Sequence, residues 1–504
     1  MLETIHAGFA LFASWQNGLA IFGGLVFGVV IGAIPGMTGT MGVALALPFT
    51  FYMSPITGIL LLVGIYKGAI YGGSIPAIVI KTPGTPAAAC TVLDGYPMAR
   101  KGQAGRALQM ALYAGCTADV ISNIALIFFA GFIASFALRF GPPEYFTLIT
   151  FSLTIIAGVC GASLTRGLVS AGFGLLAATV GLDLVYGSSR LAFGSADLMG
   201  GFSFIPVLIG LFALPEIINE YTKHQKGREH SKVDRSSVTW SDYRKSFKTI
   251  LRGSLIGVVL GAIPGIGAAP ASFMSYSEAK RNSKDGDRFG EGEIEGVAAA
   301  ESGANGVTGA TLIPLLSLGV PGDVITAVIL GAFMIHGLTP GPTLFQKHLT
   351  EIYAIFWGIL FSSFLLFITG KVAIRAFARL GEVPNAILFP IVIVLCFFGT
   401  YAVNSSMFDV GIMVATGALG YFMLKFDVPP APFLIAFILG PMFEDNLRRS
   451  LLLSKGSLGI FFSTPICWFF IILTVLSLAL IVRRNVRTHL ESRQRRRAEA
   501  KCGS

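Results

Sequence analysis

The stretch Gly28-Val-Val-Ile-Gly-Ala-Ile-Pro-Gly36 recurs later in the chain as Gly257-Val-Val-Leu-Gly-Ala-Ile-Pro-Gly265, and eight of the nine positions are identical. Such an identity is very improbable by chance, even in a glycine-rich sequence. Further pairs of segments follow in the same order: Pro76 and Pro83-Gly84 with Pro314 and Pro321-Gly322, and Pro206-Val-Leu-Ile-Gly with Pro432-Phe-Leu-Ile-Ala. The sequence therefore predicts two homologous halves, which set the plan of the fold.

Composition indicates the class of protein to which these halves belong. Only 13% of the 504 residues are Asp, Glu, Lys or Arg, and 54% are hydrophobic. A soluble globular protein carries about 25% charged residues, so this chain has too few charges to cover several soluble domains. We therefore expect an all-α polytopic membrane protein with about 12 transmembrane helices, since each span needs roughly 20 apolar residues. The 61 glycines indicate closely packed or broken helices.

Basic residues gather in two segments, which divide and orient the chain. Nine lie between Thr222 and Arg252, and eight more follow Val482. Basic clusters beside apolar spans mark the cytoplasmic side of a membrane. Neither cluster belongs to a folded soluble module, so nucleic-acid binding is not expected. The predicted parts are a first membrane repeat (1–222), a basic cytoplasmic linker (223–252), a second repeat (253–458), an extra C-terminal helix (459–482) and a basic tail (483–504).

Repeats of this size in a membrane protein are typical of secondary transporters. Their relative orientation follows from the number of spans in each half. The last apolar span, Ile466–Val482, has no clear partner in the first half. Without it, each half crosses the membrane an odd number of times, so inverted repeats are favoured over parallel ones. The predicted architecture is therefore two inverted halves with broken helices or hairpins at the centre.

Two proline-rich segments occupy corresponding places in the halves and are the best candidates for a transport site. Proline lacks an amide hydrogen, so Ser74–Ala87 and Pro314–Asp323 cannot form regular lipid-facing helices. Broken helices at matching positions of two repeats indicate where substrate binds. The alternative is that these prolines mark ordinary kinks or turns. The candidate substrate-binding residues are Ser74, Pro76, Lys81, Thr82, Pro83, Gly84, Thr85, Ser317, Pro321, Gly322 and Asp323.

Charged residues within apolar stretches are a second set of candidates, because each costs roughly 2.5–3.5 kcal/mol at the centre of a helix. Lys81 is a candidate counter-ion for a substrate carboxylate. Carboxylate and amide oxygens suit a hard cation. The alternative for charges such as Lys67, Asp119 and Asp183 is an ion pair between helices. The candidate residues for a coupling cation, Na⁺ or H⁺, are Gly36, Thr38, Glu301, Asn305 and Asp323.

Motifs for enzymatic chemistry are missing from the sequence. It contains no HExxH, P-loop or GxSxG pattern, and its six histidines show no metal-binding spacing. Its six cysteines include no CxxC pair and lie mostly in apolar stretches. We therefore expect neither an enzyme nor a protein that holds a metal or a cofactor. Energy for transport would have to come from an ion gradient or from a partner.

At this point the sequence resembles the large membrane subunit of the tripartite tricarboxylate transporter family, the TctA-type permeases. The resemblance covers nearly the whole chain. The matching stretches are Gly-Ala-Ile-Pro-Gly at 32–36, Tyr71-Gly-Gly-Ser-Ile-Pro76, Thr82-Pro-Gly-Thr-Pro86, Asp94-Gly-Tyr-Pro97, Lys101-Gly-Gln-Ala-Gly-Arg106, Phe140-Gly-Pro-Pro-Glu-Tyr145, Ile294-Glu-Gly-Val297, Gly319-Val-Pro-Gly322, His336-Gly-Leu-Thr-Pro-Gly341 and Asn446-Leu-Arg-Arg-Ser-Leu451. One departure is Lys81, where the family favours Asn, and the added positive charge would alter the preference for anions.

The resemblance implies a bacterial inner-membrane permease that works with two partners, a small membrane subunit and a periplasmic solute-binding protein. It also implies that the permease, which lies in the lipid bilayer, takes up a carboxylate such as citrate together with a cation. Two alternatives stay open at this stage: a passive anion channel, and a permease that works without a binding protein. An intramembrane enzyme is a remote third alternative, because no nucleophile or metal set is recognisable.

Overall fold

The computed structural model describes residues 2–34, 36–159, 163–183, 187–222, 234, 236–380, 385–479 and 481–483. The first part of the basic linker (223–233 and 235) and nearly all of the basic tail lie outside these residues, as does Pro35 of the repeated motif. The chain divides into two compact units. The first contains Met1–Leu138 and Ser203–Tyr421, and the second contains Arg139–Phe202 and Phe422–Ser504. The division predicted from the sequence, with boundaries at 222, 252, 458 and 482, stays a prediction.

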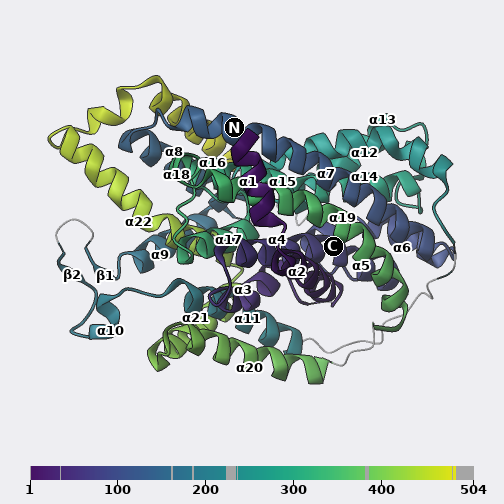
Figure 1. Cartoon of the computed structure of the whole chain (residues 1–504), viewed down its shortest axis with the longest axis horizontal. Coiled ribbons are helices and arrows are strands. Elements are labelled where there is room, and N and C mark those ends of the chain that lie inside the picture. Colours follow the sequence, from purple (N-terminus) through teal and green to yellow (C-terminus); the bar gives the residue numbers. More distant parts are fainter. Residues whose placement is uncertain are drawn as a thin grey trace, which may run out of the picture. The chain divides into compact units, whose positions relative to one another are not determined.

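The first unit is built from helices in its described parts (Figure 1). They are α1 (Leu2–Phe12), α2 (Trp15–Ala33), α3 (Gly39–Thr50), α4 (Pro55–Gly72), α5 (Ser74–Ile80), η1 (Pro86–Ala89), α6 (Val92–Arg100), α7 (Ala104–Ala137), α11 (Phe204–Thr222), α12 (Trp240–Gly261), α13 (Ala268–Asn282), η2 (Gly286–Arg288), α14 (Ile294–Asn305), α15 (Val307–Ala310), α16 (Leu312–Leu318), α17 (Val324–Ile335), α18 (Pro342–Lys347), α19 (Leu349–Leu380), α20 (Asn385–Asn404) and the greater part of α21 (Met407–Lys425).

The second unit has fewer helices and one short hairpin. Its elements are α8 (Pro142–Val159), α9 (Leu164–Ala178), β1 (Gly181–Leu182), β2 (Ser189–Arg190), α10 (Ala196–Met199), α22 (Pro430–Leu453) and η3 (Leu458–Phe462). The strands β1 and β2 pair antiparallel. An ion-pair cluster fixes this hairpin to α22: Arg190 contacts Glu444 at 2.6 Å, and Arg448 contacts Asp183 at 2.8 Å. Asp183 therefore forms an ion pair, which is the predicted alternative to a role in a functional site.

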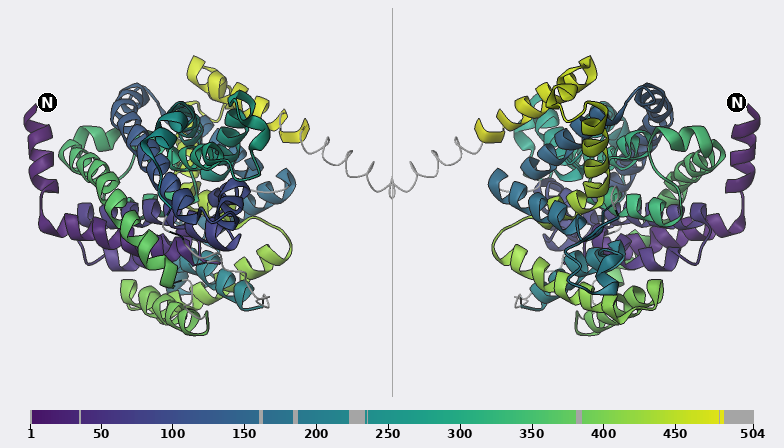
Figure 2. Two further views of the ribbon diagram at one scale, coloured as in Figure 1. Left: turned by 90° about the vertical axis from the view of Figure 1, so that its right-hand side faces the viewer. Right: turned by 90° about the vertical axis from the view of Figure 1, so that its left-hand side faces the viewer.

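Six helices among the described residues are long and apolar enough to cross a membrane, and several shorter apolar helices accompany them. The predicted all-α membrane architecture is thereby confirmed. The long helices are Trp15–Ala33, Pro55–Ile80, Ala104–Ala137, Leu349–Ala376, Met407–Lys425 and Pro465–Arg483. The short N-terminal helix α1 lies against one of them, α19, as Figure 2 shows in purple and green.

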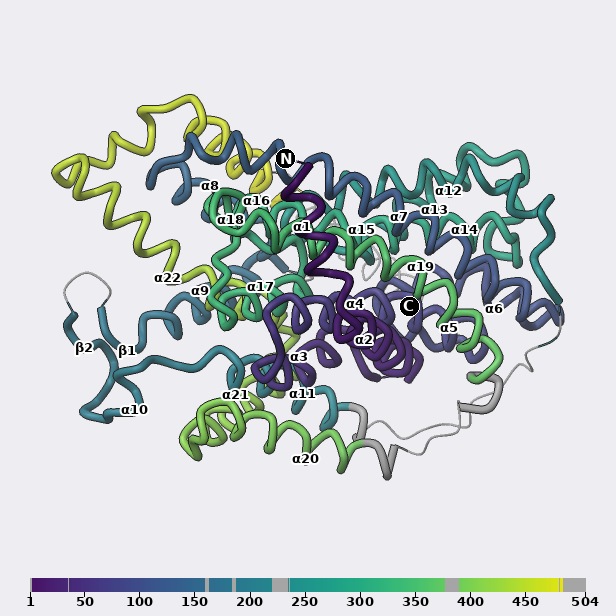
Figure 3. The backbone as a smooth tube through the Cα atoms, viewed as in Figure 1, coloured from purple at the N-terminus to yellow at the C-terminus, as the bar shows by residue number. Residues whose placement is uncertain are grey.

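The sequence repeat reappears as a repeated helix contact. Glycines on α2 let it approach α4 closely, and the two helices lie side by side in Figure 3. A Cβ added at Gly28 would lie 2.3 Å from the carbonyl oxygen of Ile65, and one added at Gly257 on α12 would lie 2.7 Å from that of Gly303 on α14. One turn further on, Gly32 meets Ala69 in the first half and Gly261 meets Val307 in the second. The glycines of the two halves are 229 positions apart, as in the repeated motif. Their contact partners are 238 positions apart, which is also the distance between Pro76 and Pro314.

We expect Gly28→Leu to lower the free energy of unfolding by about 1–3 kcal/mol or more, because the new side chain forces α2 away from the α4 backbone. Thermal unfolding of the purified chain in detergent measures the effect. Gly23→Leu is the matched control, since Gly23 lies on the same helix and has nothing within 4 Å of an added Cβ. Equal unfolding midpoints for the two variants would contradict this account of the helix contact.

The proline-rich segments also share one backbone conformation. Helix α5 ends at Lys81 with φ 58°, and α16 ends at Gly319 with φ 73°. The next amide bonds back to a proline carbonyl in both halves: Thr82 N to Pro76 O at 3.3 Å, and Val320 N to Pro314 O at 3.2 Å. The left-handed conformation suits glycine and costs roughly 1–2 kcal/mol for other residues. Lys81 adopts the left-handed conformation at the position that Gly319 occupies in the second half, where the same hydrogen bond closes the turn.

Candidate functional site

A cluster of buried polar residues surrounds Glu301 on α14. Ser74, the first residue of α5, donates a hydrogen bond to Glu301 Oε1 at 2.6 Å, and the Thr91 hydroxyl donates to the same oxygen. Asn305, one turn along α14, donates to Oε2 at 3.2 Å. Each of the four residues is 1% exposed. The two predicted repeats thus contribute jointly, because Ser74 and Thr91 come from the first and the other two residues from the second.

The Glu301 carboxylate has no Lys, Arg or His partner among the described residues. Burial of an uncompensated charge is very costly, so such a group takes up a proton or a cation. The Oδ1 atom of Asn305 is buried and has no hydrogen-bond partner in the described part of the chain. The cluster therefore contains a carboxylate, two hydroxyls and an amide oxygen, all of which are hard oxygen donors.

Other buried carboxylates of this unit have compensation of their own. Asp119 on α7 forms an ion pair with Lys67 on α4, with 2.9 Å between Oδ2 and Nζ. Asp94 on α6 accepts backbone hydrogen bonds from a loop of the second repeat, including those of Gly290 and Gly292 at 2.9 and 2.8 Å. These two aspartates have partners within the fold, which leaves Glu301 as the better candidate for an exchangeable ion.

Asp323 is the N-cap of α17 and is held there by several donors. Its Oδ1 accepts from the Thr326 amide at 2.8 Å, and its Oδ2 accepts from the Tyr66 hydroxyl at 2.8 Å. The positive end of the helix dipole stabilises a carboxylate in this position. Tyr66 lies on α4, so Asp323 joins the two predicted repeats. The structure places Asp323 in a capping role, apart from the Glu301 cluster.

The loop after α5 contains the predicted substrate residues of the first repeat. Lys81 is exposed, and its Nζ lies 5.5 Å from the centre of the Tyr96 ring. Gly84 packs so tightly against Gly32 that an added Cβ would overlap the Gly32 carbonyl oxygen. Thr85 Oγ1 is buried and lacks a hydrogen-bond partner among the residues that the structure describes. The loop thus offers an exposed ammonium and an unused buried hydroxyl.

The remaining predicted substrate residues form hydrogen bonds within their own segments or differ in their exposure to solvent. Ser317 donates its hydroxyl to the Ile313 carbonyl of the same helix at 2.6 Å. Pro76 and its counterpart Pro314 accept the turn hydrogen bonds described above. Thr82 donates to Ile80 O at 3.3 Å. Pro83 is exposed, whereas Pro321 and Gly322 are buried.

Gly36 and Thr38 follow the break after α2. Gly36 has φ 92°, and the matching Gly265 has φ 87°. Thr38 caps α3 and donates to Glu216 Oε2 on α11 at 3.1 Å. No hydrogen bond links Thr38 to the Glu301 cluster within the described ranges. The structure thus brings together Glu301 and Asn305 of the predicted cation set, and it places Thr38 and Asp323 with other partners.

Several residues of these sites have no signal in the sequence. Thr91 and Tyr66 were missed because an isolated Thr or Tyr in an apolar stretch reads as an ordinary core residue. Glu216 was missed because it lies near the end of an apolar span, beside the linker. Only the contacts across the repeats, Thr91 to Glu301 and Tyr66 to Asp323, reveal a role for the first two.

The fold and the Glu301 cluster together define a class of protein. It is an all-α membrane protein in which repeated segments break their helices in matching turns, and residues of both predicted repeats surround a carboxylate that has no basic partner in the described part of the chain. Such an arrangement is typical of secondary transporters. Residues 19–435 match the model of the tripartite tricarboxylate transporter TctA family. The chain belongs to this family, which is a family of transporters rather than of enzymes.

Two relatives from Agrobacterium vitis resemble the chain. An uncharacterised 52.8 kDa protein in the TAR-I ttuC' 3'region is 38% identical over 477 residues, which cover 92% of this chain and 93% of that protein. An uncharacterised protein in the TAR-II ttuC' 3'region is 40% identical over 214 residues, which cover 42% of this chain and 87% of that protein. No solved structure matches this chain. The resemblance inferred from the motifs is confirmed at the level of the family.

Proposed function

We propose that the chain is the large permease subunit of a tripartite secondary transporter that imports a carboxylate, of the tricarboxylate or citrate type, together with a cation. A periplasmic binding protein delivers the solute, and a small membrane subunit completes the assembly. The proposal places the permease in the bacterial inner membrane, with about 12 spans arranged as inverted repeats. The transporter needs no cofactor, because the ion gradient supplies the energy.

The observation that carries the proposal is the Glu301 cluster. A buried carboxylate with three hydrogen-bond donors, and with no basic partner among the described residues, favours the binding of Na⁺ or H⁺. Its ligands come from both predicted repeats, so a movement of one repeat against the other would change the geometry around the ion. This arrangement would couple occupancy of the ion site to the transport movement.

The proposed substrate site is the loop that follows α5 and its counterpart after α16. The exposed Lys81 ammonium would attract a carboxylate, and the buried Thr85 hydroxyl would donate a hydrogen bond to it. Ser74 begins α5 and donates to Glu301, so α5 contacts the ion site at its first residue and leads into this loop at its other end. A shared helix of this kind would connect solute binding to ion binding.

The main alternative, a passive anion channel, differs in its need for a gradient. The test reconstitutes the chain with both partners in proteoliposomes and follows uptake of radiolabelled citrate. A coupled transporter concentrates the solute only while a sodium or proton gradient persists. Conduction down the solute gradient that continues after both ion gradients are collapsed would identify a channel. Full uptake without the binding protein would identify a permease that works without it.

We expect Lys81→Gln to raise the apparent KM for the carboxylate roughly two- to fivefold, since an exposed charge contributes about 0.2–1 kcal/mol to an interaction. The maximal rate changes little, because Lys81 lies outside the ion cluster. Initial uptake rates at varied solute concentration measure both quantities. Lys81→Arg keeps the charge and serves as the control for the backbone conformation. An unchanged KM in Lys81→Gln removes Lys81 from the site.

A further inference from the structure

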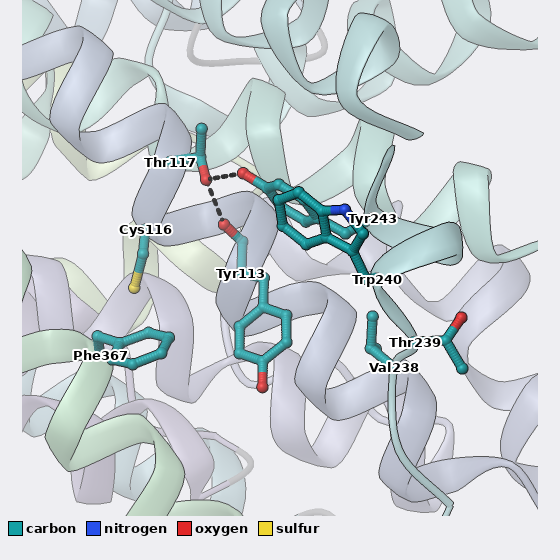
Figure 4. A pocket seen from close by; sticks show the side chains of 8 residues that line it. All are labelled: Tyr113, Cys116, Thr117, Val238, Thr239, Trp240, Tyr243 and Phe367. Carbon is teal, nitrogen blue, oxygen red and sulfur yellow. Dashed lines mark hydrogen bonds between the residues drawn. The ribbon is translucent and has the colours of Figure 1, made fainter. Parts of the chain in front are cut away.

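A separate pocket of about 330 Å³ lies where the first part of α7, the start of α12 and α19 meet. Figure 4 shows aromatic rings on several of its sides. Its lining is predominantly apolar and aromatic. The lining residues are Tyr113, Cys116, Thr117, Val238, Thr239, Trp240, Tyr243 and Phe367.

The rings form a continuous wall. Trp240 stacks on Tyr243 with 5.7 Å between ring centres, and Tyr113 lies 5.7 Å from Phe367. Tyr243 is fixed by a 2.8 Å hydrogen bond to the Thr117 hydroxyl. Trp240 is nevertheless 76% exposed, so the wall continues to the surface. A preformed apolar pocket that opens to the surface beside an exposed indole suits an alkyl chain.

The helices that line the pocket indicate its depth in the membrane. Both α7 and α19 contain segments long and apolar enough to span a membrane, so lipid is the solvent along their outer faces. Val238 and Trp240 lie within the predicted basic linker (223–252), which the charge pattern assigns to the cytoplasmic side. Trp and Tyr concentrate at the level of the lipid headgroups. The pocket therefore lies at the boundary between the acyl chains and the headgroups of the cytoplasmic leaflet.

Positive charge surrounds the pocket. Lys371 on α19 places its Nζ 4.2 Å from the ring centre of Phe367 and 5.9 Å from that of Tyr113. Arg375, one turn further along α19, is exposed, and so are Arg244 and Lys248 on α12. Two acidic residues of this region have partners of their own: Asp242 forms an ion pair with Arg106 at 2.6 Å, and Asp234 accepts a hydrogen bond from the Gly105 amide at 2.8 Å. The rim is thus basic, which matches an anionic headgroup.

We propose that this pocket binds one anionic phospholipid of the cytoplasmic leaflet, with an acyl chain against the aromatic wall and the phosphate at Lys371 and Arg375. Basic pockets between membrane helices on the cytoplasmic side bind anionic headgroups in this way. The lipid would fill the junction between the linker and α19, and it would hold the start of the second repeat at the membrane surface. This site is independent of the Glu301 cluster.

The test uses the full chain with Trp240 as its only tryptophan, the others being replaced by phenylalanine, in nanodiscs of phosphatidylcholine with or without phosphatidylglycerol. Bromine on the acyl chains quenches a nearby indole. We expect brominated phosphatidylglycerol to quench Trp240 at roughly tenfold lower mole fraction than brominated phosphatidylcholine, since each basic residue near the surface contributes about 1 kcal/mol. The preference should fall towards one in the double variant Lys371→Gln/Arg375→Gln.

Lys347→Gln, which removes an exposed lysine of α18, is the matched control and should retain the preference. Equal quenching by the two lipids in the parent chain overturns the proposal. Quenching that is unaffected by the double variant overturns the assignment of the phosphate to Lys371 and Arg375. Protection of Trp240 from brominated lipid on addition of the small membrane subunit assigns the pocket to a protein interface instead.

Discussion

Glu301→Gln is expected to abolish accumulation of the carboxylate against its gradient, reducing cation-driven uptake by at least about 100-fold. Glutamine is close in size to glutamate and can retain the hydrogen bonds from Ser74 and Thr91. It carries no charge, so it neither titrates nor balances a cation. Loss of a charged hydrogen-bonded ligand in a buried site costs about 3 kcal/mol or more, which corresponds to this change in rate.

Proteoliposome uptake measures this loss, and a second readout separates the two coupling ions. If the ion is Na⁺, sodium chloride should raise the unfolding midpoint of the parent chain above that in choline chloride, and Glu301→Gln should lose the difference. If the ion is H⁺, the variant mimics the protonated site and should still exchange solute across the membrane without accumulating it. Glu291→Gln, at an exposed position before the same helix, is the control. Normal accumulation by a well-folded Glu301→Gln chain excludes Glu301 as the coupling residue.

The second large effect is expected from the Lys67–Asp119 ion pair. Lys67→Met should lower the free energy of unfolding by about 3–5 kcal/mol, because it leaves a buried carboxylate without a counter-ion. Both side chains of the pair are 1% exposed. Asp119 also accepts from the hydroxyls of Ser363 and Thr308, at 2.6 Å each. The pair therefore connects α4 and α7 with α19 and α15, and its loss affects four helices.

Thermal unfolding in detergent measures this effect, and a double variant isolates its cause. Lys67→Met/Asp119→Leu removes both charges and should recover much of the stability, since an apolar pair avoids the cost of burying an unpaired charge. Asp427→Asn breaks an exposed pair with Arg166 and should change the free energy of unfolding by less than about 1 kcal/mol. If the double variant is no more stable than Lys67→Met, the uncompensated charge is not the cause of the loss.

Much of the local architecture could be predicted from the repeat alone. The duplicated Gly-Ala-Ile-Pro-Gly motif located two matching helix ends, and the glycines before each proline proved to be points of close helix contact. The spacing of Pro76 and Pro83 with Pro314 and Pro321 located two turns of the same conformation, which end at Lys81 and Gly319. These predictions succeeded because they depend on short-range constraints of the backbone, which proline and glycine impose wherever they stand.

The assignment of roles to individual residues was less complete. Glu301 and Asn305 were both predicted as candidates for a coupling cation, because their side chains carry hard oxygen atoms within an apolar stretch, and the structure joins them by a hydrogen bond. Ser74 was predicted as a substrate-binding residue, and the structure adds that its hydroxyl donates a hydrogen bond to Glu301. Asp323 was predicted as a candidate for both the substrate and the cation because it is a charged residue inside a broken segment, and the structure shows that it forms the hydrogen bonds of a helix cap. The residue type and its neighbours could not distinguish these roles.

The sequence by itself determined that this protein lies in a membrane, contains two related halves and breaks its helices at matching places. Composition, charge distribution and backbone restrictions fix these properties without reference to distant residues. Only the tertiary structure decided which buried charges are compensated. Lys67 forms an ion pair with Asp119, and Asp323 caps the N-terminus of α17. Glu301 accepts hydrogen bonds from hydroxyls and an amide and has no basic partner among the residues that the structure describes. Compensation depends on distances of a few ångströms between segments far apart in the chain, and those distances exist only after the helices pack.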